Sequence, residues 1–189
     1  MSNLKIVCDS LSDISIDLVN KYDIEVVPLT VIIDGKEYKD GIDITKEEFY
    51  KRLREEKIYP KTSQATYAQF KEVFTKYVNQ GKEILYIAGS STATGTYQSA
   101  NMAKNDINGK VYMYDSQSFS YGIGVLVVEA AKLANEGKTG EDIIKELKEL
   151  REKSYLLFSV DTLEYLQKGG RISSTKATIA NILNIKPIL

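Results

Sequence analysis

The chain has 189 residues, of which 43% are hydrophobic and 27% charged, a composition typical of a soluble globular protein. Its 25 lysine and arginine residues and 26 aspartate and glutamate residues give a net charge of −1, so no basic excess is available to bind a nucleic-acid backbone or an anionic membrane. The chain holds no histidine and one cysteine, which excludes within it a Ser-His-Asp triad, a Cys-His dyad, a His-ligated metal, an intrachain disulfide and a Cys-rich zinc site.

The same counts indicate a cytoplasmic protein. One unpaired thiol, Cys8, fits a reducing compartment. Residues 1–20 do not show the basic segment and apolar run of a signal peptide, and no apolar run approaches the length needed to cross a bilayer. We therefore expect a cytoplasmic location, no stable membrane insertion and no nucleic-acid partner.

Short apolar runs alternate with helical patterns from the N-terminus onward. The first part of the chain predicts a strand over 4–8, a helix over 12–22, a strand over 26–33 and a returning strand over 36–38. Asp34-Gly35 is a typical hairpin turn between the last two.

Two helices then begin with capping sequences. Thr45 precedes Glu48 by three residues and Thr66 precedes Gln69 by three, so each hydroxyl can accept from a free backbone N–H group. Later patterns predict strands over 83–88, 111–114 and 155–160, and helices over 95–107, over 122–136 and after Thr139.

This alternation predicts an α/β fold, with a mostly parallel sheet and helices on both of its faces. We expect an α/β domain over 1–153 and the start of a second, smaller α/β domain over 154–189. That second domain is expected to be incomplete, because Pro187-Ile188-Leu189 reads as the interior of a strand.

Four hydroxyl-rich or acidic loops are candidates for a binding site. In an open α/β sheet, loops at the carboxyl ends of the strands converge on one crevice, where hydroxyls and free helix N–H groups can bind an anion. The four loops are 9–13, 62–64, 89–96 and 115–120.

The third loop is the strongest of the four. Serine, threonine and aspartate are common helix caps and turn residues, which is the alternative interpretation of every one of these loops. A cap needs one hydroxyl, however, whereas the third loop carries five, and Gly95 would let a ligand approach the backbone. The five are Ser90, Ser91, Thr92, Thr94 and Thr96.

Neutral hydroxyl donors suit a carboxylate, which only accepts hydrogen bonds. The sequence has no GxxxxGK[ST] phosphate loop, and Gly122-Ile123-Gly124 lacks the third glycine of a dinucleotide fingerprint. A serine hydrolase is disfavoured, because Ser90 and Ser91 lack the GxSxG elbow and no histidine can act as base.

Motifs along the whole chain resemble those of the DegV family of fatty-acid-binding proteins. They are Asp9-Ser10, Val26-Val27-Pro28-Leu29 to Asp34-Gly35, Asp40-Gly41-Ile42-Asp43-Ile44-Thr45, Lys61-Thr62-Ser63-Gln64, Thr94-Gly95-Thr96-Tyr97-Gln98-Ser99-Ala100, Asp115-Ser116 with Gly122-Ile123-Gly124, Leu163-Glu164-Tyr165-Leu166 with Lys168-Gly169-Gly170-Arg171-Ile172-Ser173, and Asn184-Ile185-Lys186-Pro187-Ile188-Leu189. Where the family usually has serine before Gly-Thr-Tyr-Gln, this chain has Thr94, which keeps the hydroxyl.

The resemblance implies a two-domain carrier that buries a long-chain fatty acid and presents its carboxylate to a fatty acid kinase, without catalysis of its own. It implies no cofactor besides the bound acid and no metal. We expect Thr62 and Thr94 to be direct carboxylate ligands, with further donors at Ser63, Gly95 and Thr96. Arg171 is expected to face the partner. The alternative function is a phosphoryl-transfer or nucleotide-binding enzyme that uses the same loops.

Overall fold

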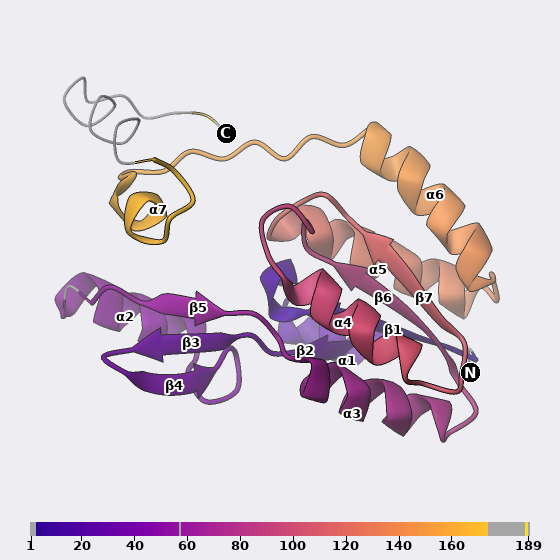
Figure 1. Cartoon of the computed structure of the whole chain (residues 1–189). Helices are drawn as coiled ribbons and strands as arrows, with labels where there is room; N and C mark the ends of the chain where they lie inside the picture. The colour runs from indigo at the N-terminus through magenta and orange to yellow at the C-terminus, as the bar shows by residue number, and fades with distance from the viewer. Residues whose placement is uncertain (1–2, 57, 174–187, 189) are drawn as a thin grey trace.

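A computed structural model describes residues 3–56, 58–173 and 188. Its larger sheet is four-stranded and fully parallel, with the order β2-β1-β6-β7 (Figure 1). The strands are β1 (Leu4–Asp9), β2 (Glu25–Val27), β6 (Glu83–Ala88) and β7 (Val111–Asp115).

Helices cover both faces of this sheet, as predicted. On one face lie α1 (Ile16–Tyr22), α5 (Tyr121–Asn135) and α6 (Gly140–Glu152), and on the other α3 (Tyr67–Val78) and α4 (Thr96–Asn105). Side chains alternate along each strand, so β1 sends Ile6 and Cys8 into the first core and Val7 into the second. All six β1 residues are buried, which is typical of a central parallel strand.

A second, three-stranded sheet stands beside the parallel one (Figure 1). Its strands are antiparallel in the order β4-β3-β5, with bounds Thr30–Ile33 for β3, Lys36–Lys39 for β4 and Lys61–Ser63 for β5. Helix α2 (Lys46–Glu55) belongs to this lobe, whose core consists of Val31, Ile33, Ile44 and Ile58. Lys46, the first residue of α2, forms an ion pair with Asp13 of the larger lobe at 2.8 Å.

The single strand predicted over 26–33 is wrong. The chain divides there into β2 and β3, which belong to different sheets. Pro28 stands at the division and has no N–H to donate to a strand neighbour. The backbone N–H of Leu29 instead donates to Ser10 Oγ at 3.1 Å, and the Pro28 carbonyl accepts from Gln69 Nε2 at 2.9 Å. These bonds fix the point where the chain leaves the parallel sheet.

Local sequence signals account for most of the element ends. Thr66 and Gln69 form a complete capping box at α3, and Thr45 accepts from the Glu48 N–H at α2. The predicted hairpin is present, with Asp34 and Gly35 at φ +51° and +80°. The first helix begins after Ser15 rather than at Ser12, because a short 3-10 turn over Ser10–Ser12 ends at Asp13 in the left-handed region.

The strand predicted over 155–160 is also wrong. After α6 the chain runs as an extended connector with no described neighbouring strand beyond a single bridge from Ser159 to Ile188. It leads to α7 (Glu164–Lys168), which lies against the smaller lobe, where the Tyr59 hydroxyl donates to Glu164 Oε1 at 2.9 Å (Figure 1). The division into domains at residue 153 stays a prediction, and most of the last motif, 184–189, lies outside the described residues.

None of the helices in the described part of the chain combines the length and the apolar character that crossing a membrane requires.

The predicted α/β class, with a parallel sheet covered by helices on both faces, is confirmed. Of the antiparallel sheet, only the hairpin of β3 and β4 was predicted.

Candidate functional site

Three of the four candidate loops meet at the carboxyl edge of the parallel sheet. The backbone N–H of Ser90 donates to the Ser118 carbonyl at 3.1 Å, and that of Ser91 to Asp115 Oδ1 at 3.3 Å, which joins the third loop to the fourth. A β-carbon on Gly89 would lie 3.0 Å from Leu11 Cδ1, so the first loop packs against the same segment. The convergence expected from the sheet topology is therefore present.

The third loop ends in a pair of hydroxyls at the start of α4. Thr94 Oγ1 and Thr96 Oγ1 lie 2.9 Å apart, and Thr94 Oγ1 also accepts from the Thr96 N–H at 3.3 Å. The N-cap residue is Gly95, so no side chain caps the helix from that position. Among the described residues no group accepts from the N–H groups of Tyr97 and Gln98, so the N-terminus of α4 keeps partial positive charge and free donors.

This hydroxyl pair keeps one proton for a ligand. Each threonine hydroxyl has one proton to donate, and a single proton forms the bond between Thr94 and Thr96. The other hydroxyl is therefore free to donate. Thr96 is fully buried and Thr94 is half-buried, so the pair stands at the boundary between core and surface. Two backbone N–H groups and one hydroxyl proton together suit a carboxylate or another small anion.

The structure places the second loop differently from the prediction. Thr62 and Ser63 lie on β5, paired with Val31 and Thr30, and both are exposed. Among the described residues, no hydrogen bond joins their side chains to Thr94. Of the predicted carboxylate ligands, Thr62 therefore lies on the antiparallel sheet, whereas Thr94 lies on the loop that follows β6 of the parallel sheet.

Gln64, the residue after β5, joins these two parts. Its Nε2 donates to Ser99 Oγ of α4 at 2.9 Å. Its Oε1 lies only 2.0 Å from the position that a β-carbon on Gly95 would occupy. The end of the second loop therefore packs directly on the first turn of α4. Gln64 belongs to the second candidate loop, but its contact with Gly95 depends on how the lobes meet and is not visible in the sequence.

Beside the loops lies a buried polar pair that the sequence analysis missed. The Tyr86 hydroxyl donates to Asp9 Oδ2 at 2.6 Å, and the Leu11 N–H donates to Asp9 Oδ1 at 3.1 Å. Burial raises the pKa of Asp9 above 3.8, while these hydrogen bonds act against that rise. Burial also raises the pKa of Tyr86 well above 10.0. Tyr86 lies inside the apolar strand β6, where the sequence predicts a core residue. Nothing in that apolar run indicates that its hydroxyl forms a hydrogen bond with Asp9.

Cys8 lies next to this pair and is chemically protected. It is fully buried, its Sγ lies 3.5 Å from Ser12 Oγ, and burial raises its pKa to about 12. The thiol therefore contributes to the core rather than to reactivity.

Arg171 is exposed near the end of the described chain. It follows α7, which ends at Lys168 and is capped by Gly169; Gly170 then adopts φ +72°, and the backbone N–H of Arg171 donates to the Leu166 carbonyl at 2.9 Å. Its guanidinium donates to the Gly169 carbonyl at 2.6 Å. The predicted glycine-flanked loop is thus a helix end, and a role toward a partner stays a prediction.

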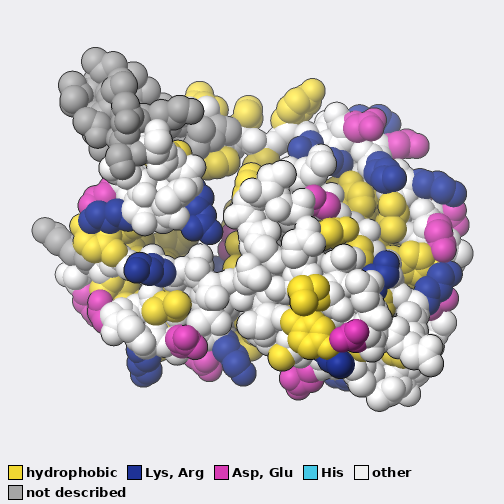
Figure 2. Space-filling model, viewed as in Figure 1, with side chains coloured by type: hydrophobic (Ala, Val, Ile, Leu, Met, Phe, Trp, Pro, Cys, Tyr) yellow, Lys and Arg dark blue, Asp and Glu magenta, His cyan; other side chains and the backbone are white. Residues whose placement is uncertain are grey.

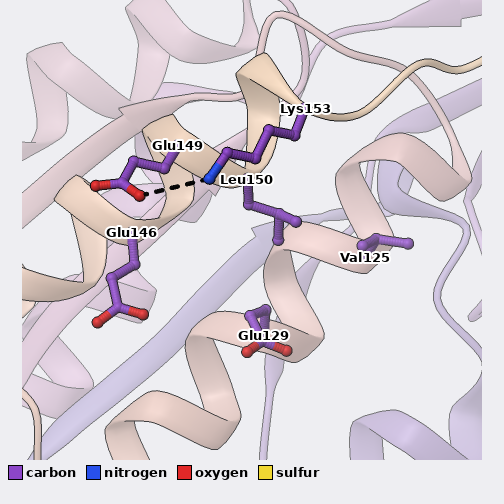
Figure 3. Close-up of a pocket in the computed structure, with 6 residues that line it drawn as sticks. All are labelled: Val125, Glu129, Glu146, Glu149, Leu150 and Lys153. Atoms are coloured by element: carbon purple, nitrogen blue, oxygen red, sulfur yellow. Dashed lines mark ion pairs between the residues drawn. The ribbon is translucent and has the colours of Figure 1, made fainter.

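A surface groove lies elsewhere, between α5 and α6, with a volume of about 560 Å³ (Figure 3). Val125 and Leu150 contribute apolar side chains to its lining. Its three carboxylates each form an ion pair, Glu149 with Lys153 at 3.8 Å, Glu129 with Lys132 at 3.1 Å, and Glu146 with Lys138.

A second groove of about 280 Å³ lies beside β3 and β4, and neither groove includes Thr62 or Thr94. The surface is also hollowed between the smaller lobe and the parallel-sheet lobe (Figure 2). The described residues contain no group of three acidic, cysteine or histidine side chains that could hold a metal ion.

A family model described as "uncharacterised protein, DegV family" matches residues 3–189. The chain belongs to the DegV family. A DegV domain-containing protein of Caldanaerobacter subterraneus is 46% identical to it over 190 residues, and one of Clostridium acetobutylicum is 44% identical over 192 residues. Each match covers all of this chain and 68% of the relative, so this DegV chain spans about two thirds of those proteins.

Solved DegV structures share its fold. A Thermus thermophilus DegV family protein, described by its fatty acid binding, superposes with a TM-score of 0.88 at 36% identity, over 100% of this chain and 67% of that one. A stearic acid-binding protein from Eubacterium ventriosum gives a TM-score of 0.90 at 31% identity, over 98% and 66% of the chains. The Bacillus subtilis DegV, described as a fatty acid binding protein, gives 0.89 at 32% identity, over 100% and 68%.

Proposed function

We propose that this DegV chain binds a long-chain fatty acid and holds its carboxylate at the N-terminus of α4. The observation that carries the proposal is the Thr94–Thr96 hydroxyl pair, which keeps one proton free beside the unpaired N–H groups of Tyr97 and Gln98. The solved relatives described as fatty acid binding share the fold over nearly the whole of this chain, which supports the ligand class.

Burial of the tail would supply most of the affinity. Each buried methylene contributes roughly 0.8 kcal/mol, so a long acyl chain offers on the order of 10 kcal/mol before ordering costs. The buried carboxylate must be hydrogen-bonded, because an unpaired buried charge is very costly. Large apolar side chains are exposed close to the hydroxyl loops, among them Phe119 and Tyr121 at 46% and 70%. They offer apolar surface that a tail can cover.

Thr62 and Ser63 complete the carboxylate site in this proposal. They lie one and two residues before Gln64, whose side chain packs on Gly95, so β5 ends close to the first turn of α4. The protein acts as a carrier without catalysis, and a fatty acid kinase phosphorylates the presented carboxylate. Arg171 would face that kinase, since a guanidinium can pair with phosphate and here it is exposed on a helix end.

The test is ligand identification followed by titration. Mass spectrometry of an organic extract of the purified chain is expected to detect a long-chain acid, and calorimetry with stearic acid is expected to show binding that Thr94→Ala weakens. Thr75→Ala removes an exposed threonine of α3 and is the matched control. Binding of ATP or inorganic phosphate without binding of stearic acid would contradict the proposal and favour the phosphoryl-transfer alternative.

A further inference from the structure

Arg151, in the last turn of α6, donates to three backbone carbonyls. Its Nε donates to Ser116 at 3.0 Å, its Nη2 to Gln117 at 3.2 Å and its Nη1 to Ser154 at 3.5 Å. Ser116 and Gln117 belong to the fourth loop, whereas Ser154 begins the connector to α7. One side chain therefore connects its own helix end with two other segments, a loop of the candidate site and the start of the connector.

The fourth loop needs such support, because its backbone is strained. Gln117 and Ser120 adopt φ values of +49° and +46°, in the left-handed region that favours glycine. Two hydrogen bonds within the loop, from the Gln117 N–H to Asp115 Oδ1 and from the Ser118 N–H to Ser116 Oγ, support this conformation, and contacts from outside the loop add to them. The Arg151 guanidinium is suited to this task, since its planar array of N–H groups can donate to several carbonyls at once.

The fourth loop in turn holds the third. The Ser118 carbonyl accepts from Ser90, and the Asp115 carboxylate accepts from Ser91. The Ser90 carbonyl then accepts from the Thr94 N–H at 3.2 Å. Hydrogen bonds, linked by short stretches of backbone, therefore lead from Arg151 through the fourth loop to Thr94, the residue that we propose as a ligand of the carboxylate.

We propose that Arg151 is a positioning residue for the carboxylate site. It touches no ligand itself. It fixes the fourth loop and thereby the position and orientation of Thr94 relative to the first turn of α4. Because it also binds the Ser154 carbonyl, it links the geometry of the site to the path of the connector. This inference rests on the proposed function, but its first test does not.

That first test is amide hydrogen exchange, measured by NMR on the whole chain without ligand. Arg151→Met removes all three donor bonds, and Arg151→Lys keeps the charge but can satisfy fewer carbonyls. Lys145→Met removes an exposed cation of the same helix that pairs only with Asp142 among the described residues, and it is the matched control. Faster exchange is expected at Ser90, Ser91 and Thr94 in Arg151→Met, less so in Arg151→Lys, and unchanged in the control.

The second test is calorimetric titration with stearic acid at a temperature where every variant is folded. Arg151→Met is expected to weaken binding roughly 2- to 30-fold, Arg151→Lys less, and Lys145→Met not at all. A uniform rise in exchange across the parallel sheet, or unchanged exchange at residues 90–94, would show a merely structural role and overturn the inference. If the wild-type chain binds no acid, the proposed function fails, and the exchange result still decides whether Arg151 positions the loop.

Discussion

Gln64 Oε1 occupies the space that a side chain on residue 95 would need, since a β-carbon there would lie 2.0 Å from it. The backbone of Gly95, at φ −79° and ψ 0°, is open to any residue, so it is the neighbouring Gln64 side chain rather than the conformation that favours glycine. The lobe of β3–β5 therefore contacts the parallel-sheet lobe through the Gln64 side chain, which packs directly against the backbone of Gly95.

Gly95→Ala should displace the Gln64 side chain. The Gln64–Ser99 hydrogen bond would be lost, and the free energy of unfolding should fall by about 0.5–1.5 kcal/mol, together with a loss of stearic acid affinity. Chemical denaturation and calorimetry measure the two effects. In the background of Gln64→Ala, the same substitution should cost little more, because its obstacle is gone. A full additional loss in that background would contradict the account.

Thr62 and Thr94 should act on the same carboxylate. Thr62→Ala and Thr94→Ala are each expected to weaken fatty-acid binding by roughly 1–3 kcal/mol, the range for a hydrogen bond to a charged group. Their effects should be non-additive, because the two hydroxyls share one ligand. Calorimetric titration of stearic acid against the four variants of the cycle measures this.

The same cycle tests the alternative role of Thr94 as a support for its own helix, since its hydroxyl accepts from the Thr96 N–H. In that case Thr94→Ala lowers stability by about 1 kcal/mol and leaves affinity unchanged. Thr94→Ser, which keeps the hydroxyl, should preserve both properties.

Tyr86→Phe should destabilise the fold in a pH-dependent way. Burial raises the pKa of Asp9 in the folded chain above its pKa in the unfolded chain. The stability that this carboxyl contributes is therefore greatest at a pH below the unfolded-state pKa, and it falls as the pH rises through the folded-state pKa. Without the Tyr86 hydroxyl the ionised carboxylate loses a donor, which raises the pKa further. The free energy of unfolding should therefore fall by about 1–3 kcal/mol at a pH above the folded-state pKa of Asp9.

The loss in Tyr86→Phe should shrink as the pH falls through the folded-state pKa of Asp9, because the protonated carboxyl does not depend on that donor. Urea denaturation across this range measures the effect. Tyr155→Phe, at a side chain that is 87% exposed, is the control and should have no effect at any pH. A loss of equal size at every pH would show that the hydroxyl does not act on the ionised carboxylate.

Arg171→Ala should separate binding from presentation. The side chain is exposed and, within the described part of the chain, bonds only to the nearby Gly169 carbonyl, so stearic acid affinity should change by less than about twofold. Formation of acyl phosphate by a fatty acid kinase should decrease, because a cation facing the phosphate is removed. Normal turnover by the kinase with this variant would refute a partner-facing role.

The sequence predicted the parallel sheet because its signals are local. Strands such as 83–88 are short apolar runs, and the helices that cover them carry readable caps such as Thr66 with Gln69. The division at Pro28 was not predicted, because β-branched residues on both sides of it favour a strand; the proline, which cannot donate to a strand neighbour, was the available signal. The apolar run 155–160 has the composition of a strand but lacks a described strand to pair with, and pairing is a tertiary property.

The candidate site was predictable only in part for the same reason. Clustered hydroxyls and a glycine at 94–96 are visible in the sequence, and the sheet topology brings loops 89–96 and 115–120 together. The contacts of Gln64 with Gly95, of Tyr86 with Asp9 and of Arg151 with the fourth loop join residues that are far apart in the chain. No spacing rule along the sequence encodes such contacts.

The burial of Cys8 has a practical consequence for labelling. Because burial raises the pKa of this thiol to about 12, almost none of it is ionised at neutral pH, and the side chain is inaccessible to reagents in the folded chain. A maleimide dye would therefore react with a cysteine introduced at an exposed position, such as Met102→Cys, without removal of the natural thiol. The native chain already provides the background for single-site fluorescence experiments, and slow labelling of Cys8 would itself report transient opening of the sheet.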